Sequence, residues 1–178
     1  MKVMIAAIVA LGMSAPEHSF EKKLKEAKCT LTEAVEKAGK DLKDVQPISA
    51  KLKQIKGKYL WDVRVAQGEK SFRRVLDAKS VEIVEKKNLK SNHAALLASA
   101  KVSLAKGIEI ALKKVPGKPV TAEMEVENGK PVIEVKVLAD GKVFEVEVDA
   151  VSGAVLEVEE DDDEDDDDDD DAEDGDDD

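Results

Sequence analysis

Cysteine, histidine and aromatic residues are scarce in this sequence of 178 residues. The single cysteine, Cys29, excludes an intramolecular disulfide, and aromatic residues make up only 3% of the chain, so aliphatic side chains must fill any core. The two histidines, His18 and His93, belong to no recognisable arrangement with a nucleophile or an acidic partner, and no glycine-rich phosphate-binding loop is present. The sequence therefore predicts no catalytic residues, no cofactor and no enzymatic activity.

Long hydrophobic runs are absent except at the N-terminus, where Lys2 precedes uninterrupted apolar residues from Val3 to Leu11. This run is too short for a transmembrane helix, which needs roughly 20 residues, but it is typical of a signal peptide. We expect a signal peptide over residues 1–14, cleaved before Ala15, and an exported protein, periplasmic or extracellular, with no membrane span. The alternative is the frayed first helix of a cytosolic protein; the abrupt return of charge at Glu17 favours export.

Charge is segregated along the chain, which has a formal net charge of −12. Residues 21–90 have a net charge of +8, residues 91–158 of −2, and residues 159–178 of −18. Because like charges repel and few apolar residues are present, we expect residues 159–178 to be a disordered polyacidic tail. A nucleic-acid partner is not expected, since this tail competes for the basic residues of the same chain.

Three roles are open for the acidic tail. It could keep the protein soluble, bind divalent cations such as Ca²⁺ weakly, or fold back to screen the basic first module. The tail does not fit a calcium-binding helix–loop–helix pattern, so any metal binding is expected to be diffuse. The candidate carboxylates for such binding are Asp165, Asp166, Asp167, Asp168, Asp169, Asp170 and Asp171.

An internal repeat is the most informative feature of the sequence. Residues 47–80 align with residues 119–152 at a shift of 72 positions without a gap, so that Pro47 falls on Pro119 and Phe72 on Phe144. The repeat predicts a first module over residues 28–87, a linker that could be helical over residues 88–101, and a second module over residues 102–158.

The pattern of each copy predicts one helix followed by antiparallel strands. In the second copy, Ser103 can cap a helix from Leu104 to about Lys114. Alternating apolar and charged residues then predict strands, with hairpin turns at Asn128-Gly129 and Asp140-Gly141. In the first copy, Thr30 and Glu33 form a predicted capping box. Arg74 takes an inward position there, which indicates either an exposed sheet edge or a side chain that reaches solvent.

The second copy resembles the PepSY domain family. The resemblance lies in a helix followed by Pro116-Gly117, then a meander that ends in Asp149-Ala150-Val151-Ser152-Gly153. The first copy has Asp77-Ala78-Lys79-Ser80, but Val81 replaces the glycine. The resemblance implies a regulatory or inhibitory module with a protein or peptide partner, since the family includes inhibitory propeptides of secreted metallopeptidases.

We therefore predict an α+β fold with two tandem copies, each a helix packed on a three- to four-stranded antiparallel meander, and a disordered acidic tail. The predicted function is that of a non-enzymatic, exported PepSY-type binding or regulatory protein, with a peptidase among its candidate partners. The alternative is an acidic protein that binds divalent cations or mineral weakly through its tail.

Overall fold

Residues 19–161 are described by the computed structural model and form four helices and eight strands. The predicted signal peptide, residues 1–14, and residues 162–178 of the predicted tail lie outside the described residues. The helices are α1 (Ser19–Glu26), α2 (Leu31–Gly39), α3 (Ala94–Ser99) and α4 (Leu104–Lys114). The strands are β1 (Gln46–Ile55), β2 (Lys58–Gln67), β3 (Lys70–Asp77), β4 (Ile83–Leu89), β5 (Lys118–Glu127), β6 (Lys130–Ala139), β7 (Lys142–Asp149) and β8 (Val155–Asp161).

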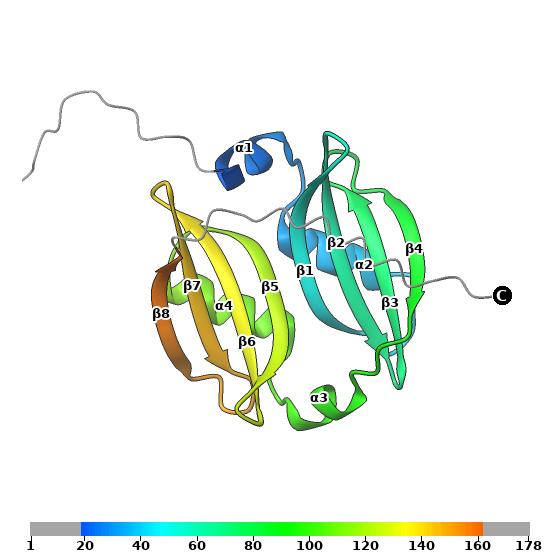
Figure 1. Ribbon diagram of the computed structural model, residues 1–178, viewed down its shortest axis with the longest axis vertical. Coiled ribbons are helices and arrows are strands. Elements are labelled where there is room, and N and C mark those ends of the chain that lie inside the picture. Colours follow the sequence, from blue (N-terminus) through cyan, green and yellow to red (C-terminus); the bar gives the residue numbers. More distant parts are fainter. Residues whose placement is uncertain (1–18, 162–178) are drawn as a thin grey trace, which may run out of the picture.

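The eight strands form a single antiparallel sheet in the order β4-β3-β2-β1-β5-β6-β7-β8 (Figure 1). The prediction of separate three- to four-stranded meanders, each under its own helix, is therefore wrong. An unpaired edge strand exposes backbone N–H and C=O groups, and pairing β1 with β5 removes one such edge from each half. The joining pairs are Ser49 with Glu123, Ala50 with Ala122, and Lys51 with Thr121.

The two halves of the sheet share the same strand connections and the same irregularities. The β1–β2 ladder shifts register between Pro47 and Ser49, and the β5–β6 ladder shifts between Pro119 and Thr121, 72 residues later. Ala50 lies opposite Ala122, which is also its partner in the repeat. An approximate two-fold axis therefore passes between these two residues and relates one half to the other.

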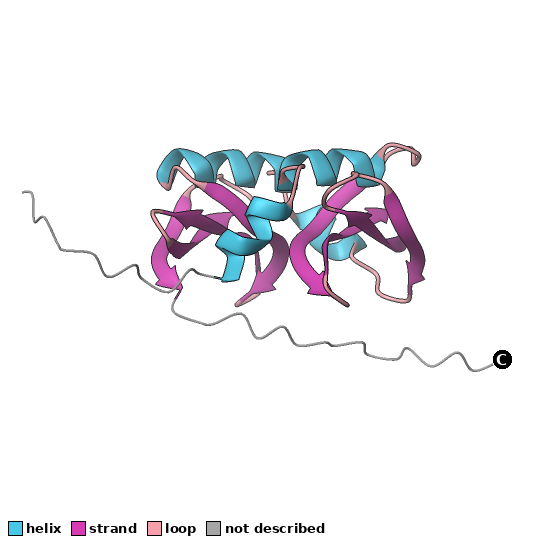
Figure 2. Cartoon of the chain, turned by 90° about the horizontal axis from the view of Figure 1, so that it is seen from above, coloured by secondary structure: helices cyan, strands magenta, loops and turns pink. Residues whose placement is uncertain are grey.

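Helices α2 and α4 cover one face of the sheet (Figure 2). The predicted caps are confirmed: Thr30 and Glu33 form the capping box of α2, and the Ser103 hydroxyl accepts the N–H of Lys106 at the start of α4. Beneath the helices, aliphatic residues from both halves belong to one continuous core. Trp61 is fully buried in this core, and its indole N–H donates to the carbonyl of Cys29 at 3.3 Å.

Helices α1 and α3 lie between the two halves of the sheet, at opposite ends of the strands (Figure 1). Helix α1 contacts β1 and helix α3 contacts β6, and each is also attached to the other half. Phe20 of α1 packs against Val120, Leu138 and Val143 of the second half. His93, the residue that precedes α3, lies 2.9 Å from the hydroxyl of Ser71 in the first half. Ser71 is 72 residues before Val143, so the two contacts are related by the approximate two-fold axis.

Arg74 is buried on the helix-covered face, where the repeat places Val146. Strand β3 lies between β2 and β4, so the interpretation of Arg74 as a marker of a sheet edge is wrong. The guanidinium instead donates to a carboxylate oxygen of Asp41 at 3.2 Å, and the Lys86 ammonium binds the same oxygen at 2.6 Å. A carboxylate from the loop after α2 therefore compensates for a charge at an apolar position.

The predicted hairpin turns are confirmed by the backbone. Asn128 and Gly129 have φ angles of 48° and 77°, and Asp140 and Gly141 have φ angles of 50° and 77°. Positive φ at both central residues is the conformation that joins two strands through a two-residue turn. These turns set the register that carries the charged side chains described below.

The Gly129→Val variant tests this register. We expect it to lower the free energy of unfolding by about 1–3 kcal/mol, because a β-branched residue is strained at positive φ. The effect should be purely conformational, since no atom lies within 4 Å of the position a Cβ would take. Chemical denaturation measures the change. Lys130→Val in the same hairpin is the control and should be nearly neutral; equal stability of both variants would contradict the turn.

Candidate functional site

The face of the sheet opposite α2 and α4 carries charged side chains, and we call it the open face. Alternation along each strand creates it: Val135 and Val137 point into the core, whereas Glu134 and Lys136 point the other way. Helices α1 and α3 lie near the ends of the strands and leave the centre of this face uncovered by described helices (Figure 1).

One row of opposing residues crosses all eight strands on the open face. Its members, each lying opposite the next, are Lys87, Arg73, Arg64, Ser49, Glu123, Glu134, Glu147 and Glu157. The first half thus contributes three adjacent cations, and the second half contributes four adjacent carboxylates. Like charges directly opposite each other in a sheet are destabilising, so this row reduces the stability of the fold.

The two halves carry opposite charges at four positions of the open face that the repeat makes equivalent. At a shift of 72 residues, Lys51 becomes Glu123, Lys53 becomes Glu125, Arg73 becomes Glu145 and Lys87 becomes Glu159. We call Lys51, Lys53, Arg64, Arg73 and Lys87 the basic half-face. We call Glu123, Glu125, Glu134, Glu145, Glu147, Glu157 and Glu159 the acidic half-face. The repeat is visible in the sequence, but the reversal of charge becomes visible only when alternate strand positions of the two copies are compared.

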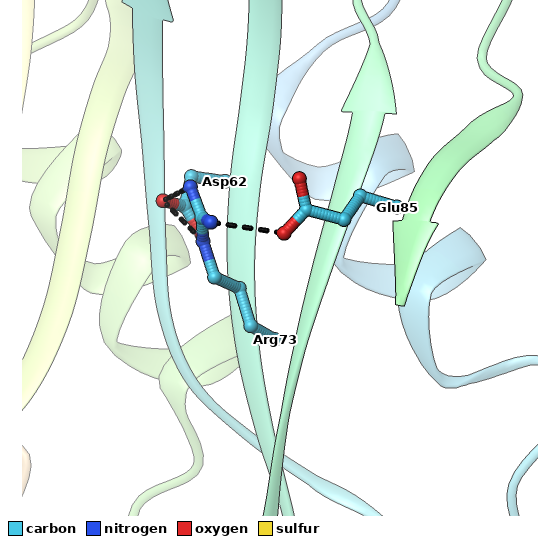
Figure 3. Close-up of polar contacts among 3 residues, drawn as sticks. All are labelled: Asp62, Arg73 and Glu85. Atoms are coloured by element: carbon cyan, nitrogen blue, oxygen red, sulfur yellow. Dashed lines mark hydrogen bonds and ion pairs between the residues drawn. The ribbon is translucent and has the colours of Figure 1, made fainter. Parts of the chain in front are cut away.

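In the basic half-face, Arg73 lies between two carboxylates (Figure 3). Its Nε donates to both oxygens of Asp62, at 3.1 and 3.0 Å, and its Nη1 donates to Glu85 at 3.1 Å. Asp62 is buried, so this fork of hydrogen bonds compensates its desolvation. Arg64, on the neighbouring strand, is exposed.

In the acidic half-face, the residue equivalent to Asp62 is Glu134, and the residue equivalent to Arg73 is Glu145. Burial raises the pKa of Glu134 to about 7, and the charges of Glu145 and Glu125 add to the effect. Burial also raises the pKa of Glu145 and, more exposed, of Glu147. The same backbone geometry therefore holds a neutralised carboxylate in one half and a cluster of mutually repelling carboxylates in the other.

Lys136 is the cation within the acidic half-face. Its ammonium lies 2.5 Å from Asp161 and 3.5 Å from Glu145. Burial alone would lower the pKa of Lys136, but its hydrogen bond and ion pair with Asp161, together with Glu145, outweigh burial and raise it. Asp161 belongs to β8, so this strand includes Glu159, Glu160 and Asp161, the first residues of the predicted tail.

Asp77 and Asp149, which are equivalent in the repeat, have structural roles. Asp149 accepts the backbone N–H groups of Val151 and Ser152 at 2.9 and 2.6 Å, and Asp77 accepts those of the residues two and three positions later at 2.8 and 2.9 Å. These hydrogen bonds hold the pKa of both carboxyls below the usual value. In the first half, Val81 adopts φ 60° where Gly153 has φ 75°, so the turn persists without its glycine.

Ser71 and His93 form a hydroxyl–imidazole contact that the sequence analysis missed. Ser71 is only 1% exposed, so its hydroxyl is buried where it meets the imidazole. Burial lowers the pKa of His93. The equivalent contact in the other half is the apolar packing of Phe20 on Val143, which indicates that both contacts attach a helix to the sheet.

The predicted cation binding finds no metal centre among the described residues. Within residues 19–161, no three His, Cys, Asp or Glu side chains are grouped so that they could hold a metal ion. The candidate ligands Asp165–Asp171, like His18, lie outside the described residues, so weak Ca²⁺ binding by the tail stays a prediction. In the same described segment, every helix is too short or too polar to span a membrane.

The raised pKa of Glu134 predicts a pH-dependent stability. The unfolded carboxyl ionises near pH 4.5 and the folded one near pH 7, so the folded state holds the proton longer and stability falls as pH rises through this window. Glu134→Gln should therefore raise the melting temperature at pH 8 and change it little at pH 4.5. Glu36→Gln, on the exposed side of α2, is the control. A gain that is equal at both pH values would contradict the burial of the Glu134 charge.

Comparison with known proteins finds a family similarity in the second half. No curated protein matches the chain. Among solved structures, the crystal structure of a candidate lipoprotein from Clostridium difficile 630 aligns at 20% identity and a TM-score of 0.45, over 82% of this chain and 99% of that chain. Residues 101–159 match the PepSY family model, which is described as a peptidase propeptide and YPEB domain. The segment that builds α4 and β5–β8 is thus similar to the PepSY family, as its sequence predicts.

Proposed function

We propose that this protein is a non-enzymatic, exported regulatory module that binds a protein partner through the open face of its sheet. The observation that carries the proposal is the match of residues 101–159 to a family described by peptidase propeptides. A propeptide domain is by nature a binding module, and the partner class that the resemblance implies first is a peptidase. The proposal assigns no catalytic residue to the chain.

The open face is the surface best suited to this binding. The opposite face of the sheet is buried in the core beneath α2 and α4. The row of adjacent glutamates from Glu123 to Glu157 lowers stability and supports no contact in the core. Local rules of this kind are most often violated at functional sites. Charges of one sign grouped on a surface also speed encounter with a complementary partner and disfavour wrong ones.

We further propose that the first half is a second PepSY-like unit. Its support is geometric: strands β1–β4 repeat the order of β5–β8, the register shift after Pro47 matches that after Pro119, and Asp77 makes the same turn as Asp149. Two units of similar geometry, with charges reversed at four equivalent positions of the open face, then offer two different surfaces to one partner. A basic segment of the partner suits the acidic half-face, and an acidic segment suits the basic half-face.

Site-specific photo-crosslinking in the exported fraction tests the face that binds. A photoreactive p-benzoylphenylalanine replaces Thr121, at the centre of the open face, or Thr32, which is exposed on α2. We expect a covalent adduct with an identifiable protein from the first position and none from the second. Adducts from Thr32 alone, or from neither position, would contradict the proposal.

A purified partner then allows a quantitative check. Glu147→Lys combined with Glu157→Lys should weaken its binding by roughly ten-fold or more, because two complementary charges are reversed. Glu36→Lys, which lies on α2, should leave the affinity unchanged. Isothermal titration calorimetry measures both. Peptide hydrolysis by the chain itself that disappears in His93→Ala would instead show that the protein is an enzyme.

A further inference from the structure

The basic half-face is a positively charged surface that the described part of the chain leaves incompletely neutralised. Lys51 is paired with Glu123 at 2.5 Å, and Arg73 is paired with Asp62 and Glu85. Among residues 19–161, Lys53, Arg64 and Lys87 form no ion pair. Three cations from three different strands therefore face the same side of the sheet and favour an anionic ligand.

The chain itself carries a ligand of that chemistry. Residues 162–178 contain 15 acidic residues and no basic residue. They follow Asp161, where β8 ends at the outer edge of the acidic half-face. Glu157 and Glu159 on the same strand repel a polyanion that leaves from this edge, and the cations beyond the seam between β1 and β5 attract it.

The length of this segment is sufficient to reach the basic half-face. Five strand-to-strand steps separate β8 from β2, which amounts to about 24 Å at the usual spacing of about 4.8 Å. Seventeen residues follow Asp161, and an extended chain spans up to about 3.3–3.6 Å per residue, or about 56–61 Å. The segment can therefore cross the acidic half and still place most of its carboxylates beside Lys53, Arg64 and Lys87.

We propose that residues 162–178 occupy the basic half-face of their own chain as an intramolecular pseudo-ligand. Tethering gives the segment an effective concentration on the order of millimolar, so it screens the basic half-face from weaker anionic ligands. A second copy is a poorer occupant, because two chains that each carry a net charge of −12 repel each other. If the protein acts as proposed above, the segment competes with any acidic region of the partner; this last step rests on the proposed function, whereas the docking does not.

Paramagnetic relaxation in the full-length chain tests the docking. A nitroxide is attached at Asp170→Cys, with Cys29→Ala to leave one reactive thiol, and amide broadening is read in β1–β3 and in the helices. At about 0.05 M salt we expect broadening around Lys53, Arg64 and Lys87. At about 1 M salt, where the screening length falls to about 3 Å, it should disappear.

Two matched variants decide whether the basic half-face is responsible. Arg64→Glu combined with Lys87→Glu should reduce the broadening roughly three-fold or more, because the local charge is reversed. Lys37→Glu combined with Lys113→Glu makes the same change in net charge on α2 and α4, which lie on the other side of the sheet, and should leave the broadening intact.

The contrary outcomes are distinct. Weak, uniform broadening that neither pair of variants changes would show a solvated tail and overturn the proposal. Broadening of an isotope-labelled chain by a separate spin-labelled chain would show that the tail binds a second copy instead. Neither result depends on a partner, so failure of the docking and failure of the proposed function are separately visible.

Discussion

The short ladder between β1 and β5 is the contact on which the rest of the structure depends. It consists of three residue pairs centred on Ala50 and Ala122, whose small side chains belong to the core on the helix-covered face. The ion pair of Lys51 with Glu123 spans the same seam, but its partly exposed side chains contribute little to stability. Backbone pairing and the shared core therefore join the halves, and this union makes the open face continuous.

Because the open face is continuous, the basic half-face and the acidic half-face form one surface with a positive and a negative region. Asp62 and Glu134 occupy the same place in each half, but Arg73 neutralises the first and Glu145 repels the second. The apolar positions that face the helices are mostly shared between the halves, which preserves the fold. The charged positions that differ lie on the open face, so they leave the packing of the core unchanged. They lower the stability of the fold only through repulsion between neighbouring like charges.

Local features of the sequence predicted local structure well. Asn128-Gly129, the capping box of Thr30 and the turn at Asp149 each depend on residues within four positions, so the pattern alone identifies them. The single sheet escaped prediction because the pairing of β1 with β5 joins residues 70 to 74 positions apart and leaves no periodic trace in the sequence. Three further features depend on the register and the three-dimensional neighbours of each strand: the positions of α1 and α3 between the halves, the contact of Arg74 with Asp41, and the row of charges. The candidate ligands of the tail lie outside the described residues, so that part of the site stays a prediction.

The approximate two-fold symmetry raises a problem of orientation that the charges resolve. A partner that recognised only the backbone shape of the open face could bind in two orientations, related by the axis between Ala50 and Ala122. Equal charges on both halves would make these poses equal in energy. With Lys51 replaced by Glu123 and Arg73 by Glu145 in the second half, a partner of unequal charge meets attraction in one pose and repulsion in the other. The reversal thus selects one orientation through a repulsive element, as specific interfaces commonly do.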